Sequence, residues 1–267
     1  KIAYFDEVVC TIVIETGTRV SGLLAGDYDI ITVVPPADLP RLESDPNVEP
    51  AIGGPGLVLN LEFNHHEDAG LSANSLFRQA VLARANMEEL GNLVSDGNPD
   101  FFDMNPSLYR REQSQWWTDV ASDLWNQNNP ERAQELLDEM GYDGEEFIMV
   151  CQDQTNHQSL CLGLAEQLRD IGVNVVTQQV DRPGQDGIVE NTSGWHARSF
   201  SFTMRFTPAD WDATLSCATD RVYWCNDEME DVFRQIQSSF DLDEQKTLSD
   251  EIQRIHHEEV FAITLPV

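Results

Sequence analysis

The sequence predicts an α/β domain whose sheet is in part parallel. A strand over residues 147–150, a helix with apolar residues from 160 to 171, and a strand over 173–180 follow one another at short spacing. Strand, helix and strand at this spacing form a β-α-β unit, whose two strands are parallel. No stretch of the chain repeats another, and the length of 267 residues allows one large domain or two small ones.

The amino-terminal part alternates apolar runs with turns. Residues 1–14 are rich in isoleucine and valine and alternate loosely, which favours a strand. The chain opens directly in this apolar stretch, without the basic and apolar regions of a signal peptide, as if it began in the middle of a fold. A short helix is expected over 18–25, a second apolar run over 30–34 stops at two prolines, and a strand is expected over 57–63.

The middle of the chain holds the most clearly bounded helix. Asn129 is a good N-cap, Pro130 suits the first helical turn, and Gly141 ends the helix. Before it, apolar residues between 74 and 90 follow helical spacing and predict one helix. Residues 92–128 are polar and irregular, and we expect them to form a long excursion over the surface.

Two amphipathic helices and a strand close the chain. One helix is expected from near Asn226 to Phe240 and the other from near Asp243 to Ile255, each with apolar residues on one face. A short strand is expected over 261–265. The whole chain is therefore expected to be a single α/β lobe.

The charge excludes two classes of partner. Sixteen lysines and arginines stand against 47 acids, which gives a net charge of −31. Such a surface repels phosphate backbones and anionic lipids, so nucleic-acid binding and electrostatic membrane docking are not expected. The acids are spread along the chain, which favours a solvated surface suited to a saline milieu over a negative cleft for cations.

The five cysteines allow two short disulfides. Cys151 and Cys161, and likewise Cys217 and Cys225, are close enough in sequence to be bridged, which fits an oxidising compartment. The alternative is five buried thiols in a reducing compartment. Cys10 is left over and could pair outside this chain. No C-x-x-C or zinc-ligand spacing is present.

No residue pattern indicates catalysis or a resident metal or other cofactor. The nucleophile-elbow, phosphate-loop and dinucleotide-binding motifs are absent. His256 and His257 are neighbours on a predicted helix and point about 100° apart, so they do not readily chelate one ion. His65 and His66 follow a strand, where a polar strand exit is favoured over a metal site. A metal- or carboxylate-dependent hydrolase that uses His65/His66 or an acid pair remains the alternative function.

Several segments, in their order, carry a resemblance to a known family. They are RVSGLLAGDYDI (19–30), LNLEFN (59–64), FRQAV (77–81), ANM (85–87), NPERAQELL (129–137), the stretch 207–225 and the helix 241–255. Together they resemble the carboxy-terminal lobe of the extracytoplasmic solute-binding proteins of ABC importers, in the dipeptide/oligopeptide/nickel-binding family.

The resemblance implies a periplasmic-binding-protein-like lobe with a mixed sheet flanked by helices. Residues 1–14 and 261–267 would lie near the hinge to a missing amino-terminal lobe, which is also a candidate partner for Cys10. The implied function is non-enzymatic capture of a peptide or other small solute by closure of two lobes, followed by docking on an ABC permease. The implied location is periplasmic or cell-surface, and a disulfide spans the family's loop where Cys217 and Cys225 fall. An isolated lobe acting in a surface assembly is a third possibility.

The resemblance also implies which residues contact the solute. The family strand commonly carries Gly-Trp-x-x-Asp, and here Ser201 takes the tryptophan position and Met204 the aspartate position. The predicted ligand-binding residues are Asn64, Phe200, Phe202, Met204, Arg205, Asp210 and Trp211. Aromatic, soft and cationic side chains suit a ligand with an apolar body and an anionic group. The alternative is that alternate residues of 200–206 face the core and Arg205 pairs with a surface acid. Trp195 is expected in the core.

Overall fold

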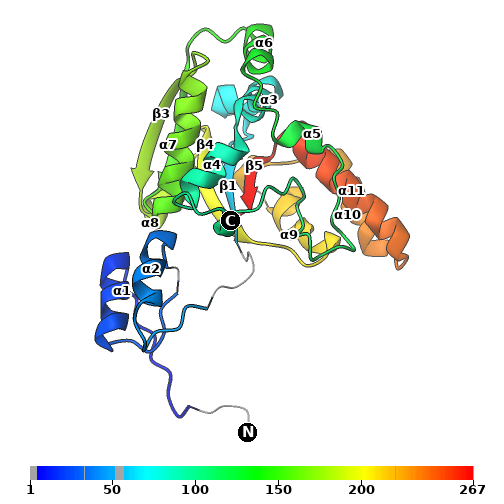
Figure 1. The fold of residues 1–267 in the computed structure, drawn as a ribbon. Coiled ribbons are helices and arrows are strands. Elements are labelled where there is room, and N and C mark those ends of the chain that lie inside the picture. Colours follow the sequence, from blue (N-terminus) through cyan, green and yellow to red (C-terminus); the bar gives the residue numbers. More distant parts are fainter. Residues whose placement is uncertain (1–4, 33, 52–56, 220, 267) are drawn as a thin grey trace. The chain divides into compact units, whose positions relative to one another are not determined.

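The computed structural model describes residues 5–32, 34–51, 57–219 and 221–266. It divides the chain into two compact units, Lys1–Gly54 and Pro55–Val267, and each is described by itself (Figure 1). The prediction of one lobe over 1–267 placed no boundary at residue 54.

In its described part, the first unit is helical. Helix α1 (Thr16–Ala25) begins at Glu15, whose carboxylate accepts hydrogen bonds from the first turn, and ends at Gly26 in the left-handed conformation. The predicted helix over 18–25 is therefore confirmed. A 3-10 turn (Pro36–Asp38) leads into the short helix α2 (Leu39–Glu43).

The predicted strand over 1–14 is wrong for its described residues. Residues 5–14 form no strand, and most of their side chains are exposed; residues 1–4 lie outside the described part. An extended segment becomes a strand only when its backbone pairs with another strand, and no described residue pairs with this one. The apolar run over 30–34 likewise forms no strand in its described residues, from which residue 33 is excluded.

The second unit is built on a mixed sheet, as predicted. Its described strands are β1 (Leu57–Phe63), β2 (Glu146–Gln152), β3 (Asn174–Val180), β4 (Ala197–Thr203) and β5 (Ala262–Pro266), in the order β3-β2-β4-β1-β5. β2 is parallel to β3 and to β4, which confirms the β-α-β unit. β1 is antiparallel to both β4 and β5.

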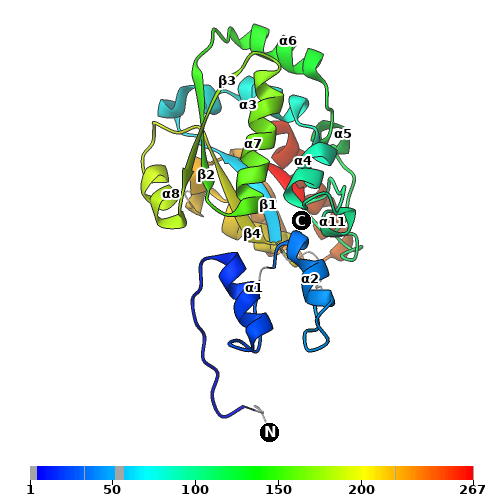
Figure 2. The same ribbon diagram turned by 60° about the vertical axis from the view of Figure 1, so that its left-hand side comes forward.

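Helices cover both faces of this sheet. One face carries α3 (Ser75–Arg84), α4 (Met87–Val94), α6 (Pro130–Met140) and α7 (Thr155–Arg169), which share one core with Leu59, Leu61 and Phe63 of β1. The other face carries α8 (Arg182–Val189), α10 (Asp227–Ser238) and α11 (Leu242–Glu259), which share a second core with Val58 of β1 and Phe202 of β4. Figure 2 shows α7 lying across the first of these faces.

Short elements complete the unit. They are the 3-10 turns η2 (Glu67–Ala73), η3 (Pro99–Phe101), η4 (Pro208–Trp211), η5 (Cys217–Thr219) and η6 (Arg221–Tyr223), and the helices α5 (Ser122–Trp125) and α9 (Asp212–Leu215). The helices expected from Asn226 and Asp243 are present as α10 and α11, and the capped helix at Asn129 is present as α6.

The single helix predicted over 74–90 is two helices. Ala85 leaves the helical conformation (φ −61°, ψ 124°) and ends α3. Asn86 then caps α4, because its side chain accepts a hydrogen bond from the backbone N–H of Glu89. Apolar spacing continued through the break because both helices bury their apolar residues in the same core.

The segment 92–128 is irregular, as predicted, but it is not a surface excursion. Leu108 and Tyr109 are buried in the second core. The side-chain amide of Gln253 on α11 donates to the backbone carbonyls of Thr118 and Val120, and its oxygen accepts from the N–H of Leu108. One buried glutamine thus supplies the hydrogen bonds that irregular backbone needs in an interior.

Replacing Gly91 with alanine is expected to destabilise the protein by about 1–3 kcal/mol. Gly91 lies within α4, and a Cβ there would collide with the ring of Phe102 from the irregular segment. Gly187→Ala in α8 is the matched control, since nothing lies within 4 Å of its added Cβ. Urea denaturation of both variants checks this, and equal unfolding free energies for the two would contradict the packing of Phe102 on α4.

The structure contains both disulfides that the spacing allows. Cys151–Cys161 joins β2 to α7, and Cys217–Cys225 closes the loop before α10. Cys10 is a free, exposed thiol. The alternative of five buried thiols therefore does not describe this structure.

Candidate functional site

The sheet has a topological switch point between β2 and β4. From β2 the chain passes through α7 to β3 on one side, and then through α8 to β4 on the other side of β2. α7 packs in the first core, whereas α8 packs against the second. In open α/β sheets, ligands bind outside the carboxyl ends of the strands at such a point.

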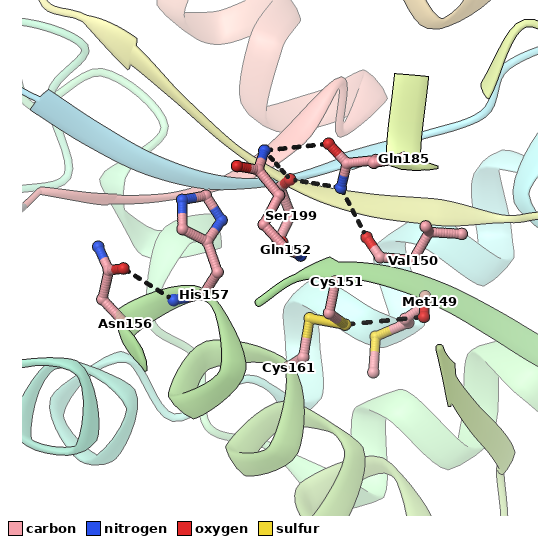
Figure 3. Close-up of a disulfide and its surroundings, with 9 residues drawn as sticks. All are labelled: Met149, Val150, Cys151, Gln152, Asn156, His157, Cys161, Gln185 and Ser199. Carbon is pink, nitrogen blue, oxygen red and sulfur yellow. Dashed lines mark hydrogen bonds between the residues drawn. A yellow bond between two sulfur atoms is a disulfide. The ribbon is translucent and has the colours of Figure 1, made fainter. Parts of the chain in front are cut away.

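β2 and β4 separate at their carboxyl ends, and buried polar side chains fill the split. The two strands pair only through Met149–Ala197 and Val150–Arg198. Further along, the backbone N–H of Gln152 donates to the hydroxyl of Ser199 (3.0 Å), and the amide of Gln185 donates to the carbonyls of Val150 and Ser199 (3.0 Å each). The Gln152 amide donates to Gln185 Oε1, also at 3.0 Å (Figure 3).

His157 lies in the first turn of α7 beside this split. The residue is 2% exposed, and its Nε2 lies 3.1 Å from the hydroxyl of Ser201 on β4. Its Nδ1 has no hydrogen-bond partner among the described residues. Burial, and secondarily the positive charge of Arg182, lower the pKa of His157 to about 4, so the imidazole is neutral at neutral pH.

The start of α7 favours a negative group. The side chain of its N-cap residue, Gln154, accepts no hydrogen bond from the first turn, and the one local side-chain acceptor among the described residues is Asn156 Oδ1, which takes the N–H of His157 (3.0 Å). Arg182, at the start of α8, lies over the ring of Phe200 with its guanidinium carbon 4.5 Å from the ring centre. The Nε of Arg182 donates to both carboxylate oxygens of Asp186, at 2.9 and 3.1 Å. Backbone N–H groups and a guanidinium together bind carboxylates and phosphates.

Three of the residues predicted to bind ligand are buried in the second core. Phe202, Met204 and Trp211 are 8%, 4% and 1% exposed. The rings of Phe202 and Trp211 meet edge-on with their centres 5.6 Å apart, and Tyr109 contacts Trp211 in the same way. These side chains therefore support the segment after β4 by packing.

Phe200, Arg205 and Asp210 lie nearer the surface. Phe200 is half-buried on the same face of β4 as Phe202, and its contact with Arg182 brings it to the switch point. Arg205 donates to the hydroxyl of Thr214. The carboxylate of exposed Asp210 accepts from the N–H and hydroxyl of Thr207, which closes the turn η4.

Asn64 has a structural role. It is fully buried, and its amide donates to the carbonyls of Thr192 (3.1 Å) and Trp195 (3.2 Å). Its oxygen accepts from the backbone N–H of His66. Asn64 thus links the end of β1 to the segment before β4, where Trp195 is buried as expected.

The histidine pairs form no metal site in the described structure. His65 Nε2 lies 3.2 Å from the carbonyl of Phe261, and His66 Nδ1 accepts from the N–H of Asp68. Among the described residues, no group of three or more histidine, cysteine, aspartate or glutamate side chains is placed to hold an ion. Nor does any described helix combine the length and apolarity that crossing a membrane requires.

Sequence reasoning missed Gln152, His157, Arg182 and Gln185. The sequence holds a signal for two of them, because Gln152 and Arg182 each lie two residues after a predicted strand, 147–150 and 173–180. Carboxyl ends of parallel strands share one edge, so those residues were candidates by topology alone.

A hollow of about 820 Å³ lies between α4 and α7. Glu88, Leu93, Asp96 and Ser159 are among the residues that line it, and none of the predicted ligand-binding residues does.

Comparison with known sequences places the chain in a family. The family described as "Bacterial extracellular solute-binding proteins, family 5 Middle" matches residues 1–220. The chain belongs to this family. This family-5 chain is 27% identical to a "Probable peptide ABC transporter periplasmic-binding protein" of Sinorhizobium fredii, over 96% of its own length and 50% of that protein.

Solved structures of low identity share the fold of this family-5 chain. The oligopeptide-binding protein AppA of Bacillus subtilis, in complex with a nonapeptide, has a TM-score of 0.81 at 17% identity, covering 96% of this chain and 53% of AppA. A dipeptide-binding protein of Pseudoalteromonas sp. SM9913, in complex with Met-Leu, has a TM-score of 0.82 at 18% identity, covering 95% of this chain and 51% of that protein. The chain thus spans about half the length of the relatives it matches.

Proposed function

We propose that this chain forms one lobe of an importer receptor that captures a peptide or peptide-like solute at the switch point of its sheet. The observation that carries the proposal is the split between β2 and β4, where α7 and α8 both begin beside buried Gln152 and Gln185. Membership of the solute-binding family supports it. The relatives are about twice as long, so a second lobe would close over the solute and favour the closed state through contacts with both lobes.

The geometry of the switch point suits the carboxylate of the solute. The backbone N–H groups of Thr155 and Asn156 in the first turn of α7 are offered to a carboxylate, whereas that of His157 is bonded to Asn156 Oδ1, and Arg182 offers a positive charge. Met204, at the position of the family aspartate that pairs with a peptide amine, is buried in the core. Recognition of the acidic end of the solute is therefore better supported here than recognition of its amine.

The proposed setting is extracytoplasmic, with an ABC permease as the partner that accepts the solute. Two disulfides fit an oxidising compartment. The scarcity of lysine and the net charge of −31 fit an exposed, saline milieu. We propose no catalytic residue, and no contact within the described part of the chain favours the hydrolase alternative.

Peptides with a free carboxyl terminus should bind the full gene product about tenfold more tightly than the same peptides amidated at that end, a difference of about 1.4 kcal/mol. Arg182→Gln should remove most of this preference, because the guanidinium is the charged donor at the site. Arg132→Gln is the control: it removes the same charge from the surface of α6, where Arg132 pairs with Glu135. Calorimetric titration with dipeptides and oligopeptides measures both effects.

Two results would count against the proposal. One is the absence of saturable binding by any peptide tested. The other is equal affinity for free and amidated peptides in the wild-type protein, which would remove the carboxylate from the switch point.

A further inference from the structure

We propose that the Cys151–Cys161 disulfide is a positioning device that holds the first turn of α7 in the geometry that receives the solute. The inference rests on the proposed function. The bridge joins the penultimate residue of β2 to the second turn of α7, and both cysteines are buried in the first core. Figure 3 shows it directly beneath Gln152 and His157.

The bridge encloses the part of the site that the end of β2 and the first turn of α7 contribute. The ten-residue separation between its cysteines contains Gln152, Gln154 and His157. The side chains of residues 153–155 are exposed, so this stretch gains little from packing. Its backbone is tied down at one point in particular, where the N–H of Asp153 donates to the carbonyl of Val180 (2.9 Å).

Besides the hydrogen bond between Asp153 and Val180, two anchors flank the exposed turn. The disulfide fixes the core side of α7, and the hydrogen bonds of Gln152 to Ser199 and Gln185 fix the end of β2. Closing a short loop reduces the conformations available to the residues inside it. A site held in its binding conformation loses less entropy when the ligand binds, which raises affinity.

The second disulfide provides an internal control. Cys217–Cys225 encloses a loop of similar length in a different segment, and none of the switch-point residues lies within it. Removing either bridge deletes two sulfurs and opens one short loop. Comparing the two variants therefore distinguishes a loss of stability that follows the removal of either bridge from an effect confined to the start of α7.

The test compares Cys151→Ala/Cys161→Ala with Cys217→Ala/Cys225→Ala in the full gene product. Hydrogen exchange without solute should accelerate about tenfold at the amides of 153–157 in the first variant and stay unchanged there in the second. The dissociation constant for a free-acid peptide should rise about tenfold in the first variant. Cys151→Val/Cys161→Ala, which refills part of the lost volume, serves if the alanine pair does not fold.

The outcomes are distinguishable. Wild-type protein that binds no peptide overturns the proposed function. Wild-type protein that binds peptide, while the Cys151/Cys161 variant keeps both its affinity and its slow exchange at 153–157, overturns the positioning role. Exchange that accelerates equally in β3, α6 and 153–157 also overturns it, because the bridge would then stabilise the whole fold without positioning this turn.

Discussion

Replacing Arg198 with methionine is expected to lower the free energy of unfolding by about 3–5 kcal/mol. Arg198 on β4 faces Glu62 on β1 across the antiparallel pair, with Nη2 and Nε each 2.9 Å from Glu62 Oε2. Glu62 has no exposed surface, so the variant removes the guanidinium of Arg198 from a carboxylate that stays in the interior. The contact of Arg198 with the Phe200 ring is lost as well. Urea denaturation at neutral pH measures the change.

Two further variants separate the causes. The double variant Glu62→Leu/Arg198→Met should recover much of the loss, because the buried carboxylate is removed together with the guanidinium that faces it. Arg132→Met breaks the exposed pair with Glu135 and should cost about 0–1 kcal/mol. If Arg198→Met costs no more than Arg132→Met, the buried ion pair does not have the role assigned to it.

Acid should destabilise the protein between pH 6.5 and pH 4 through its buried histidines. Burial lowers the pKa of both His157 and His257 from 6.5 to about 4. The carbonyl of Pro106 and the negative charge of Asp123 both raise the pKa of His257, but the lowering caused by burial is larger. The pKa values of His65 and His256 are also lowered, again mainly by burial.

The direction in which stability changes with pH follows from proton uptake. Between pH 6.5 and 4 the unfolded chain binds protons that the folded chain does not, so the free energy of unfolding falls as the pH falls. The contribution is complete above pH 6.5 and is lost by about pH 4. For His157 and for His257 the loss is at most about 3 kcal/mol each. Urea denaturation at a series of pH values gives the curve.

The variant His257→Gln separates the contribution of His257 to the pH dependence of stability from the contribution of the carboxylates, which also titrate in acid. The glutamine amide can still donate to the carbonyl of Pro106, which His257 Nε2 contacts at 2.9 Å. The variant should lose less stability than the wild type between pH 6.5 and 4. Parallel curves for the two proteins would show that His257 is not held neutral by the fold.

Elements with local signals could be predicted from the sequence. Asn129 and Gly141 bound α6 because a cap and a left-handed glycine act within one turn of the backbone. The parallel pairing of β2 and β3 was predicted from the order strand, helix, strand at short spacing. The strand prediction was wrong for residues 5–14 because a β-branched composition favours an extended chain but does not supply a partner strand.

The sequence predicted the strand beside the candidate site but not most of the residues that form it. The strand that became β4 was identified, and Phe200 does lie at the switch point. Alternation along a strand gives two sets of side chains but does not say which set a helix will cover. The second core covers Phe202 and Trp211, whereas Gln152 and Gln185 come together only because β2 and β4 separate.

The sequence by itself determined the α/β class, the capped helices, the parallel unit and the family resemblance. These depend on interactions between residues a few positions apart, or on the order of segments. Only the tertiary structure decided that part of the segment 92–128 is interior, that Asn64 links β1 to the segment before β4, and that Gln152 meets Ser199 at the split between β2 and β4. Those outcomes depend on contacts between distant segments, whose geometry exists only after the sheet has formed.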